Sequence, residues 1–188
     1  MVVRIVTDST ADLTQEQQQA AGITVVPLNV HFGDQVFRDH VDLTTDEFFR
    51  RPQPAVGVFE EVYRTLRQNG DEIVSVHLSS KVSGTYNSGL MAAKSVDEKA
   101  IDVVDSLSTS MALGFMALEG AKLARAGKDR ATITERLRAL VPKARVICVV
   151  DTLTYLERGG RIGHARALLG SLLNVKPILQ LKEGEVVP

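Results

Sequence analysis

Short runs of β-branched residues alternate along the chain with longer segments of helical period. Most of these runs are nearly continuous in Val and Ile, which is typical of strands buried on both faces of a parallel sheet. The alternation therefore predicts an α/β fold, with an open, mainly parallel sheet, helices on both faces and right-handed crossovers. The predicted strands are Val2–Val6, Ile23–Val30, Ile73–His77, Ile101–Val104, Val146–Val150 and Lys176–Leu181.

End signals mark the helices between these strands. A threonine followed three residues later by Gln or Glu has the spacing of a capping box and predicts a helix start. The segment Phe59–Gln68 places its apolar residues on one helical stripe, and Leu107–Ala126 ends at Gly127, as helices often do. The three predicted capping boxes begin at Thr14, Thr44 and Thr132.

The last part of the chain has a different pattern. A glycine-rich break at 155–163 precedes a helical segment that runs to about Leu173, and a turn at Glu183-Gly184 follows the last predicted strand. The ending predicts a hairpin whose second strand has barely begun, and a lone hairpin is marginally stable in water. We therefore expect that it packs on another subunit or that the natural protein continues beyond Pro188.

Composition narrows the class of protein. Hydrophobic residues make up 44% of the 188 residues and charged residues 24%, with 22 Lys and Arg against 23 Asp and Glu. This balance is that of a soluble globular protein and lacks the basic footprint of nucleic-acid binding. No apolar run approaches the ~20 residues of a membrane helix, and Met1–Val6 lacks the design of a signal peptide. The single Cys148, expected to be buried and inert, fits a cytoplasmic protein.

Hydroxyl and Asp side chains cluster after four of the predicted strands. The carboxyl ends of parallel strands meet at one edge of the sheet, where open α/β folds bind ligands, and a following helix attracts anions. Any one cluster also fits a helix N-cap. Four together, two of them longer than a cap requires, favour a ligand site, above all at Ser83-Gly84-Thr85, where Gly allows close backbone approach. The clusters occupy 7–10, 78–85, 105–110 and 151–154.

The residues in these clusters limit the ligand. Asp8, Asp105 and Asp151 argue against a strongly cationic phosphate pocket; they could instead hold a metal for phosphoryl transfer, which leaves a phosphotransferase as the alternative function. No Asp-x-Asp pair or His cluster accompanies them, and the sequence has no dinucleotide fingerprint, phosphate loop or nucleophile elbow. An interaction scaffold that binds no small molecule is a third interpretation.

Two arginines, Arg158 and Arg161, flank the glycines of the 155–163 break. Both could be solvated, or one could reach a small anion, because a guanidinium fork suits a carboxylate. Hydroxyls, one Arg and an aliphatic interior together favour a carboxylate on an apolar tail.

Five stretches resemble the DegV family of bacterial fatty-acid-binding proteins. The resemblance implies a Rossmann-like N-terminal domain, here residues 1–154, and the beginning of a smaller second α/β domain at 155–188. It further implies a long-chain fatty acid, such as a C16–C18 acid, buried between the domains, with its carboxylate held by Ser83 and with Arg161 in the same shell. The matching stretches are Val6–Leu13, Ser79–Asn87, Val104–Ser106, Tyr155–Ile162 and Leu172–Leu179.

The family resemblance also implies that the protein performs no chemistry and needs no cofactor. Some members present the acyl chain to a fatty-acid kinase, which phosphorylates the carboxylate for phospholipid synthesis. Two departures stand out: Arg51 occupies a position where members have a ligand-binding Thr, with a shortened segment at 48–53, and the family supplies a His from beyond Pro188. We expect the ligand to be bound by Ser83, Gly84, Thr85, Arg161, Ser9 and Thr10.

Overall fold

A computed structural model describes residues 2–32, 35–38, 56–169 and 176–188. Its centre is a four-stranded sheet with the order β2-β1-β5-β6, in which every neighbouring pair is parallel. The predicted α/β class is thereby confirmed. The strands are β1 (Val3–Asp8), β2 (Ile23–Val26), β5 (Glu72–His77) and β6 (Ile101–Asp105).

The predicted strand Ile23–Val30 is divided in two. After β2, the chain starts a separate antiparallel hairpin of β3 (Asn29–Phe32) and β4 (Gln35–Arg38). Pro27 lies between β2 and β3, and a proline has no N–H to donate to a strand ladder. The apolar residues therefore continue past Val26 in the sequence, although strand β2 ends there.

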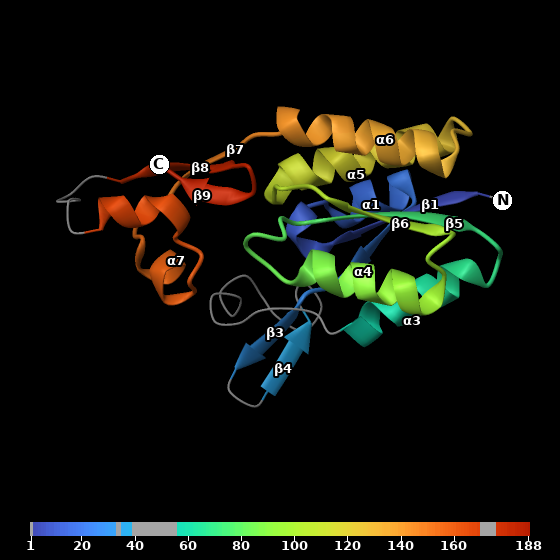
Figure 1. The fold of residues 1–188 in the computed structure, drawn as a ribbon, viewed down its shortest axis with the longest axis horizontal. Coiled ribbons are helices and arrows are strands. Elements are labelled where there is room, and N and C mark those ends of the chain that lie inside the picture. The colour runs from blue at the N-terminus through green and yellow to red at the C-terminus, as the bar shows by residue number, and fades with distance from the viewer. Residues whose placement is uncertain (1, 33–34, 39–55, 170–175) are drawn as a thin grey trace.

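Helices cover both faces of the parallel sheet (Figure 1). On one face, α3 (Val56–Arg67) and α4 (Thr85–Val96) enclose a core that includes Phe59 and Tyr63. On the other, α5 and α6 enclose a second core with Leu113, Met116 and Leu137. The helices on that second face are α1 (Gln15–Ala21), α5 (Ser110–Arg125) and α6 (Arg130–Leu140).

The helix ends test the predicted caps. The Thr14 capping box is present, with Thr14 Oγ1 accepting the Gln17 N–H at 3.2 Å and Gln17 Oε1 accepting the Thr14 N–H at 2.9 Å. The prediction of Thr132 as a cap is wrong: α6 begins earlier, because the Asp129 carboxylate accepts the Thr132 N–H at 2.8 Å and serves as the N-cap. The helix predicted at Thr44 lies outside the described residues.

The strand predicted at Val146–Val150 was expected in the parallel sheet, and this expectation is wrong. After η2 (Val141–Lys143), β7 (Val146–Val149) pairs antiparallel with β8 (Ile178–Lys182), which pairs with β9 (Glu185–Val187). A Val- and Ile-rich run fits either kind of ladder, so the partner strand decides its direction. Cys148 in β7 is exposed, which corrects the expectation of a buried thiol.

This three-stranded sheet carries a small core of its own. The segment that holds helix α7 (Thr154–Arg158) and the 3-10 helix η3 (Gly163–Leu168) packs on it, with Ile162 and Ala165 in one buried cluster with Leu179 of β8. The predicted turn at Glu183-Gly184 joins β8 to β9, with φ of 53° and 86° at the two residues. The division of the chain at residue 154 stays a prediction. No helix in the described ranges is long and apolar enough to cross a membrane.

Candidate functional site

Three of the four predicted polar clusters meet at the carboxyl edge of the parallel sheet. The Ser79 N–H donates to the Ser108 carbonyl at 2.8 Å and joins the loop after β5 to the loop after β6. The Ser79 hydroxyl donates to the Gly184 carbonyl at 2.8 Å, so the β8–β9 turn rests on the same edge. The fourth cluster follows β7 and belongs to the other sheet, because β7 does not join the parallel strands.

The Ser83-Gly84-Thr85 stretch forms the start of α4. The helix begins at Thr85, and its N-cap, Gly84, has no side chain to accept an N–H. Ser83 Oγ lies 2.9 Å from Thr85 Oγ1 and accepts the Thr85 N–H at 3.3 Å, whereas the backbone N–H groups of Tyr86 and Asn87 have no acceptor among the described residues. A helix start with open N–H groups and two hydroxyls is suited to an anion.

Of the two arginines of the glycine-rich break, Arg161 reaches this loop. Its Nε–H donates to the carbonyl of Val82 at 3.0 Å, and its Nη1 donates to the carbonyl of Gly159 at 2.5 Å. The remaining guanidinium N–H groups have no acceptor in the part of the chain that the structure describes, and the side chain is half-buried. Arg158 is exposed. The structure thus brings Arg161 to the residue that precedes Ser83.

Ser9 and Thr10 make structural hydrogen bonds at the end of β1. The Leu28 N–H donates to Ser9 Oγ at 3.1 Å, and Thr10 donates its hydroxyl, at 2.6 Å, and its N–H, at 3.1 Å, to Asp8 Oδ1. Within the described residues no hydrogen bond joins either one to Ser83 or Arg161. Their role toward a ligand stays a prediction, and Ser9 lines a separate pocket of about 490 Å³ at this end of β1.

The three aspartates of the metal hypothesis do not converge. Asp8 is fully buried and holds four hydrogen-bond donors, and Asp105 accepts the N–H groups of Ser80 and Leu107. Asp151 is exposed beside the other sheet, where its hydrogen bond to Lys176 Nζ, 2.6 Å long, lowers the pKa of the carboxyl. The described residues contain no group of three or more His, Cys, Asp or Glu side chains that could hold a metal ion. Among the described residues, the three aspartates therefore do not share one site.

A buried chain of side chains behind this edge was missed by sequence reasoning. Tyr63 OH donates to Ser75 Oγ at 2.8 Å, Ser75 Oγ lies 2.7 Å from His77 Nε2, and His77 Nδ1 lies 2.9 Å from Asp8 Oδ2. All four side chains are fully buried, and burial raises the pKa of Tyr63, with the charge of Asp8 adding to the rise. The available signal was the pair Ser75 and His77, two polar residues on one face of the predicted strand Ile73–His77, whose other residues are apolar.

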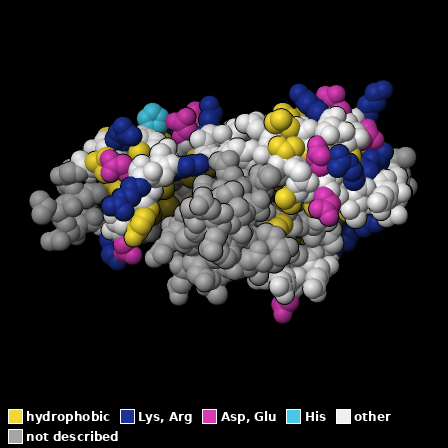
Figure 2. Space-filling view, turned by 90° about the horizontal axis from the view of Figure 1, so that it is seen from below, with side chains coloured by type: hydrophobic (Ala, Val, Ile, Leu, Met, Phe, Trp, Pro, Cys, Tyr) yellow, Lys and Arg dark blue, Asp and Glu magenta, His cyan; other side chains and the backbone are white. Residues whose placement is uncertain are grey.

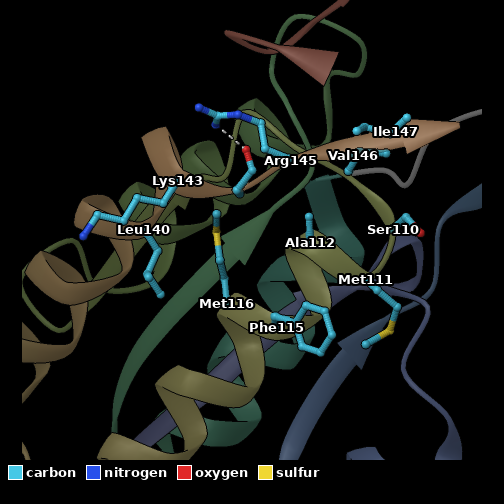
Figure 3. Close-up of a pocket in the computed structure, with 11 residues that line it drawn as sticks. Ser110, Met111, Ala112, Phe115, Met116, Leu140, Lys143, Arg145, Val146 and Ile147 are labelled. Atoms are coloured by element: carbon cyan, nitrogen blue, oxygen red, sulfur yellow. Dashed lines mark hydrogen bonds between the residues drawn. The ribbon is translucent and has the colours of Figure 1, made fainter. Parts of the chain in front are cut away.

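An apolar pocket of about 440 Å³ lies between α5, η2 and β7 (Figure 3). Met111, Phe115 and Leu140 line it, while the charged ends of Lys143 and Arg145 point away from these side chains. None of the predicted ligand-binding residues lines this pocket. Seen from below, Lys, Arg, Asp and Glu side chains are interspersed over the described surface, with no continuous basic patch on that part of this face (Figure 2).

Comparison with known proteins gives consistent matches along the chain. A family profile described as "Uncharacterised protein, DegV family" matches residues 2–188. A DegV domain-containing protein of Halalkalibacterium halodurans is 39% identical over 198 residues, which cover 99% of this chain and 70% of that protein.

Some solved structures with the same fold are of proteins described as binding fatty acids. A fatty-acid-binding DegV family protein of Thermus thermophilus has a TM-score of 0.90 and 38% identity, covering 99% of this chain and 70% of that one. A stearic acid-binding protein of Eubacterium ventriosum has a TM-score of 0.89 and 30% identity, covering 98% and 68%. DegV of Bacillus subtilis, described as a fatty acid binding protein, has a TM-score of 0.87 and 35% identity, covering 100% and 71%.

Proposed function

Because this chain belongs to the DegV family over residues 2–188, we propose that it binds a long-chain fatty acid, such as a C16–C18 acid, by its carboxylate at the start of α4. The observation that carries the proposal is the hydrogen bond from Arg161 to the carbonyl of Val82, the residue that precedes Ser83 in the chain. In this proposal Thr85 donates its hydroxyl proton to Ser83 Oγ, which leaves the Ser83 proton for the carboxylate. The open N–H groups of α4 donate to the same carboxylate, and Arg161 neutralises its charge.

The acyl tail would lie between the parallel sheet and the three-stranded sheet. The two units meet where Gly184 contacts Ser79 and where Arg161 contacts Val82, both next to the proposed head-group site. Ligand sites form preferentially at such junctions, where apolar surface from both sides can enclose an apolar chain. In this proposal Gly84, Ser9 and Thr10 complete the polar end of the site.

We further propose that the protein is a non-catalytic carrier that works in the cytoplasm and presents its fatty acid to a kinase. Asp8 and Asp105 direct their oxygens to N–H and O–H donors of the protein itself, which supports binding without phosphoryl transfer by this chain. Cys148 is the sequence's one cysteine and is exposed, which suits a reducing compartment.

Mass analysis of bound lipid tests the carrier function. Protein purified from a bacterial host is extracted with solvent, and the delipidated protein is then titrated with palmitate and with hexadecanol. We expect an extracted fatty acid, renewed uptake of palmitate, and weaker uptake of the alcohol, which lacks the charge that Arg161 would neutralise. A protein that yields no lipid and takes up neither ligand contradicts the proposal and favours a scaffold.

The division of labour with a kinase needs a separate experiment. Palmitate-loaded protein is incubated with ATP and Mg²⁺, with and without a bacterial fatty-acid kinase, and hydroxylamine traps any acyl phosphate as a hydroxamate. We expect hydroxamate only when the kinase is present. Product formed by the chain alone would overturn the non-catalytic assignment, and no product in either mixture would overturn the kinase partnership.

A further inference from the structure

Four buried side chains connect helix α3 to the edge of the sheet that carries the proposed head-group site. They run from Tyr63 in α3 through Ser75 and His77 in β5 to Asp8 at the end of β1, with successive distances of 2.8, 2.7 and 2.9 Å. We call these four side chains the Tyr63–Asp8 relay. The Phe59 ring packs edge-on against the His77 ring at 4.9 Å between centroids and helps to fix its plane.

Donor and acceptor capacities give the relay a direction. Tyr63 OH donates to Ser75 Oγ, so the Ser75 proton is free to point at His77 Nε2. Nε2 is then the acceptor, and Nδ1 carries the proton that is donated to Asp8 Oδ2. Every hydrogen bond of the relay thus points toward one carboxylate, an arrangement in which successive bonds polarise one another.

The order hydroxyl, imidazole, carboxylate is that of the serine hydrolases, but the relay has no access to a substrate. Ser75 and His77 are fully buried, and the Ser75 oxygen already accepts the Tyr63 proton. A nucleophile must reach a carbonyl carbon, and Ser75 is enclosed between the sheet and α3. The relay therefore has to act through other residues.

Asp8 provides the connection to the head-group site. The oxygen that accepts the His77 proton, Oδ2, also accepts the backbone N–H of Leu78 at 3.0 Å. The next residue, Ser79, has a carbonyl that accepts the N–H groups of both Val82 and Ser83 at 3.1 Å, so the loop from Leu78 to Ser83 is one hydrogen-bonded unit. Moving Asp8 would therefore move both Ser83 and the Val82 carbonyl that holds Arg161.

We propose that the Tyr63–Asp8 relay is a positioning network for the carboxylate site: it sets the orientation of Asp8 and, through the Leu78 amide, the placement of Ser83. The inference rests on the proposed fatty-acid binding, and it assigns to that site four residues that do not touch the ligand. It predicts that the loss of palmitate affinity on substitution grows along the relay from Tyr63 toward Asp8.

Relay variants are compared for palmitate and hexadecanol affinity. We expect Tyr63→Phe to lower palmitate affinity about threefold and Ser75→Ala about tenfold, because the latter leaves His77 Nε2 without its donor. Hexadecanol affinity should change less than about twofold in both variants, because a displaced Ser83 costs a charged head group more than a neutral one. Equal losses for the two ligands would show that the relay only supports packing.

Two glycines provide a matched pair with all relay atoms retained. A Cβ added at Gly89 would lie 3.2 Å from both His77 Cδ2 and Tyr63 OH, whereas one added at Gly120 would lie 3.3 Å from Ile5 Cδ1 in the other core. We expect Gly89→Ala to lower the ratio of palmitate to hexadecanol affinity and Gly120→Ala to leave it unchanged, although both crowd a core. The same ratio in both variants would overturn the inference.

NMR of the ligand-free protein separates this inference from the proposed function. We expect long-range nitrogen–proton spectra to show His77 protonated at Nδ1 only, and Ser75→Ala to shift the Ser83 and Gly84 amide resonances while Gly120→Ala does not. A proton on Nε2, or unmoved Ser83 and Gly84 amides, would overturn the relay even if the wild type binds palmitate. A wild type that binds no palmitate but shows these shifts would overturn the proposed function and leave the coupling of relay to loop intact.

Discussion

The side chain of Arg161 donates its Nε–H to the backbone carbonyl of Val82 at 3.0 Å, although 79 residues separate the two in sequence. The contact spans the two sheets, because Val82 belongs to the loop after β5 and Arg161 to the segment between α7 and η3. A backbone carbonyl carries no net charge, so the guanidinium stays positive and available to an anion. This hydrogen bond holds the arginine at the residue next to Ser83.

Arg161→Gln removes the positive charge while keeping a side chain that can donate to Val82. We expect palmitate affinity to fall about ten- to a hundredfold and hexadecanol affinity to change little, because a hydrogen bond to a charged group is worth about 1.5–3 kcal/mol. Titration calorimetry on both ligands measures the difference. The matched control is Arg158→Gln, which removes the exposed arginine on the other side of the same glycines. Equal losses of palmitate affinity in Arg161→Gln and Arg158→Gln would show that the net charge of the protein, and not the position of Arg161, determines the affinity.

Ser83→Ala removes one proposed donor to the carboxylate. We expect palmitate affinity to fall about tenfold or more, and the free energy of unfolding to drop by less than about 1 kcal/mol, because the hydroxyl also accepts the Thr85 N–H. Ser80→Ala, in the same loop, should alter neither quantity, since Ser80 bonds through its backbone N–H. A lower melting temperature with unchanged palmitate affinity would show that the Ser83 hydroxyl only stabilises the start of α4 and does not bind the ligand.

Gly184→Ala tests the docking of the β8–β9 turn on the Ser79 loop. Gly184 has φ of 86°, and an added Cβ would lie 2.6 Å from Ser79 Oγ. Gly70, with φ of 73° and nothing within 4 Å of an added Cβ, is the matched control for backbone strain alone. We expect Gly70→Ala to cost about 1 kcal/mol of unfolding free energy and Gly184→Ala about 1–3 kcal/mol more. Equal costs in chemical denaturation would mean that the turn is not held against Ser79.

Asp71 is expected to make stability depend on acid pH. Its side chain accepts Arg4 Nε–H at 2.7 Å and the Val2 N–H at 3.2 Å, and the hydrogen bond from Arg4 holds the pKa of the carboxyl below its ordinary value. A lowered folded-state pKa stabilises the fold above the unfolded-state pKa of about 4, and this stability is lost as pH falls through the folded-state pKa.

Thermal unfolding of the wild type and Asp71→Asn across acid and neutral pH measures this contribution. The variant should be less stable near neutral pH, and the gap should close as the solution is acidified, because the wild-type carboxyl is then protonated as well. A gap of constant size at every pH would show that the Asp71 charge contributes nothing.

The sequence predicted three of the four parallel strands well, namely β1, β5 and β6, because their Val and Ile runs are largely buried and end in polar clusters. It failed at β7, where Val146–Val149 has the same composition but pairs antiparallel with β8. The reason is physical: composition reports that a strand can pack, whereas direction depends on a partner about thirty residues away in the chain. The exposure of Cys148 follows from that change of sheet.

The candidate site was predicted in part. Ser83 and Arg161 stood out by residue type, and Arg161 bonds to Val82, the neighbour of Ser83. The cluster at 7–10 was expected to fit a helix N-cap, and Asp8 caps η1 (Ser9–Ala11). The relay was not predicted, because no histidine cluster accompanies the aspartates in the sequence and His77 stands alone at the end of a predicted strand. Its partners come from β1, β5 and α3, and only the register of β1 against β5 places them together.

Ser83 lies in a loop of the parallel-sheet unit and Arg161 in the unit of the three-stranded sheet, which has a consequence for how the protein with the proposed ligand would differ from the protein without it. A carboxylate held by both would act as a bridge between two bodies joined by the short segment 141–145, and mass action would then favour the docked arrangement in proportion to ligand concentration. The two bodies would then be held together more tightly when the ligand is bound than when it is absent. A partner could distinguish the ligand-bound from the ligand-free protein by this difference, without contacting the buried acyl chain.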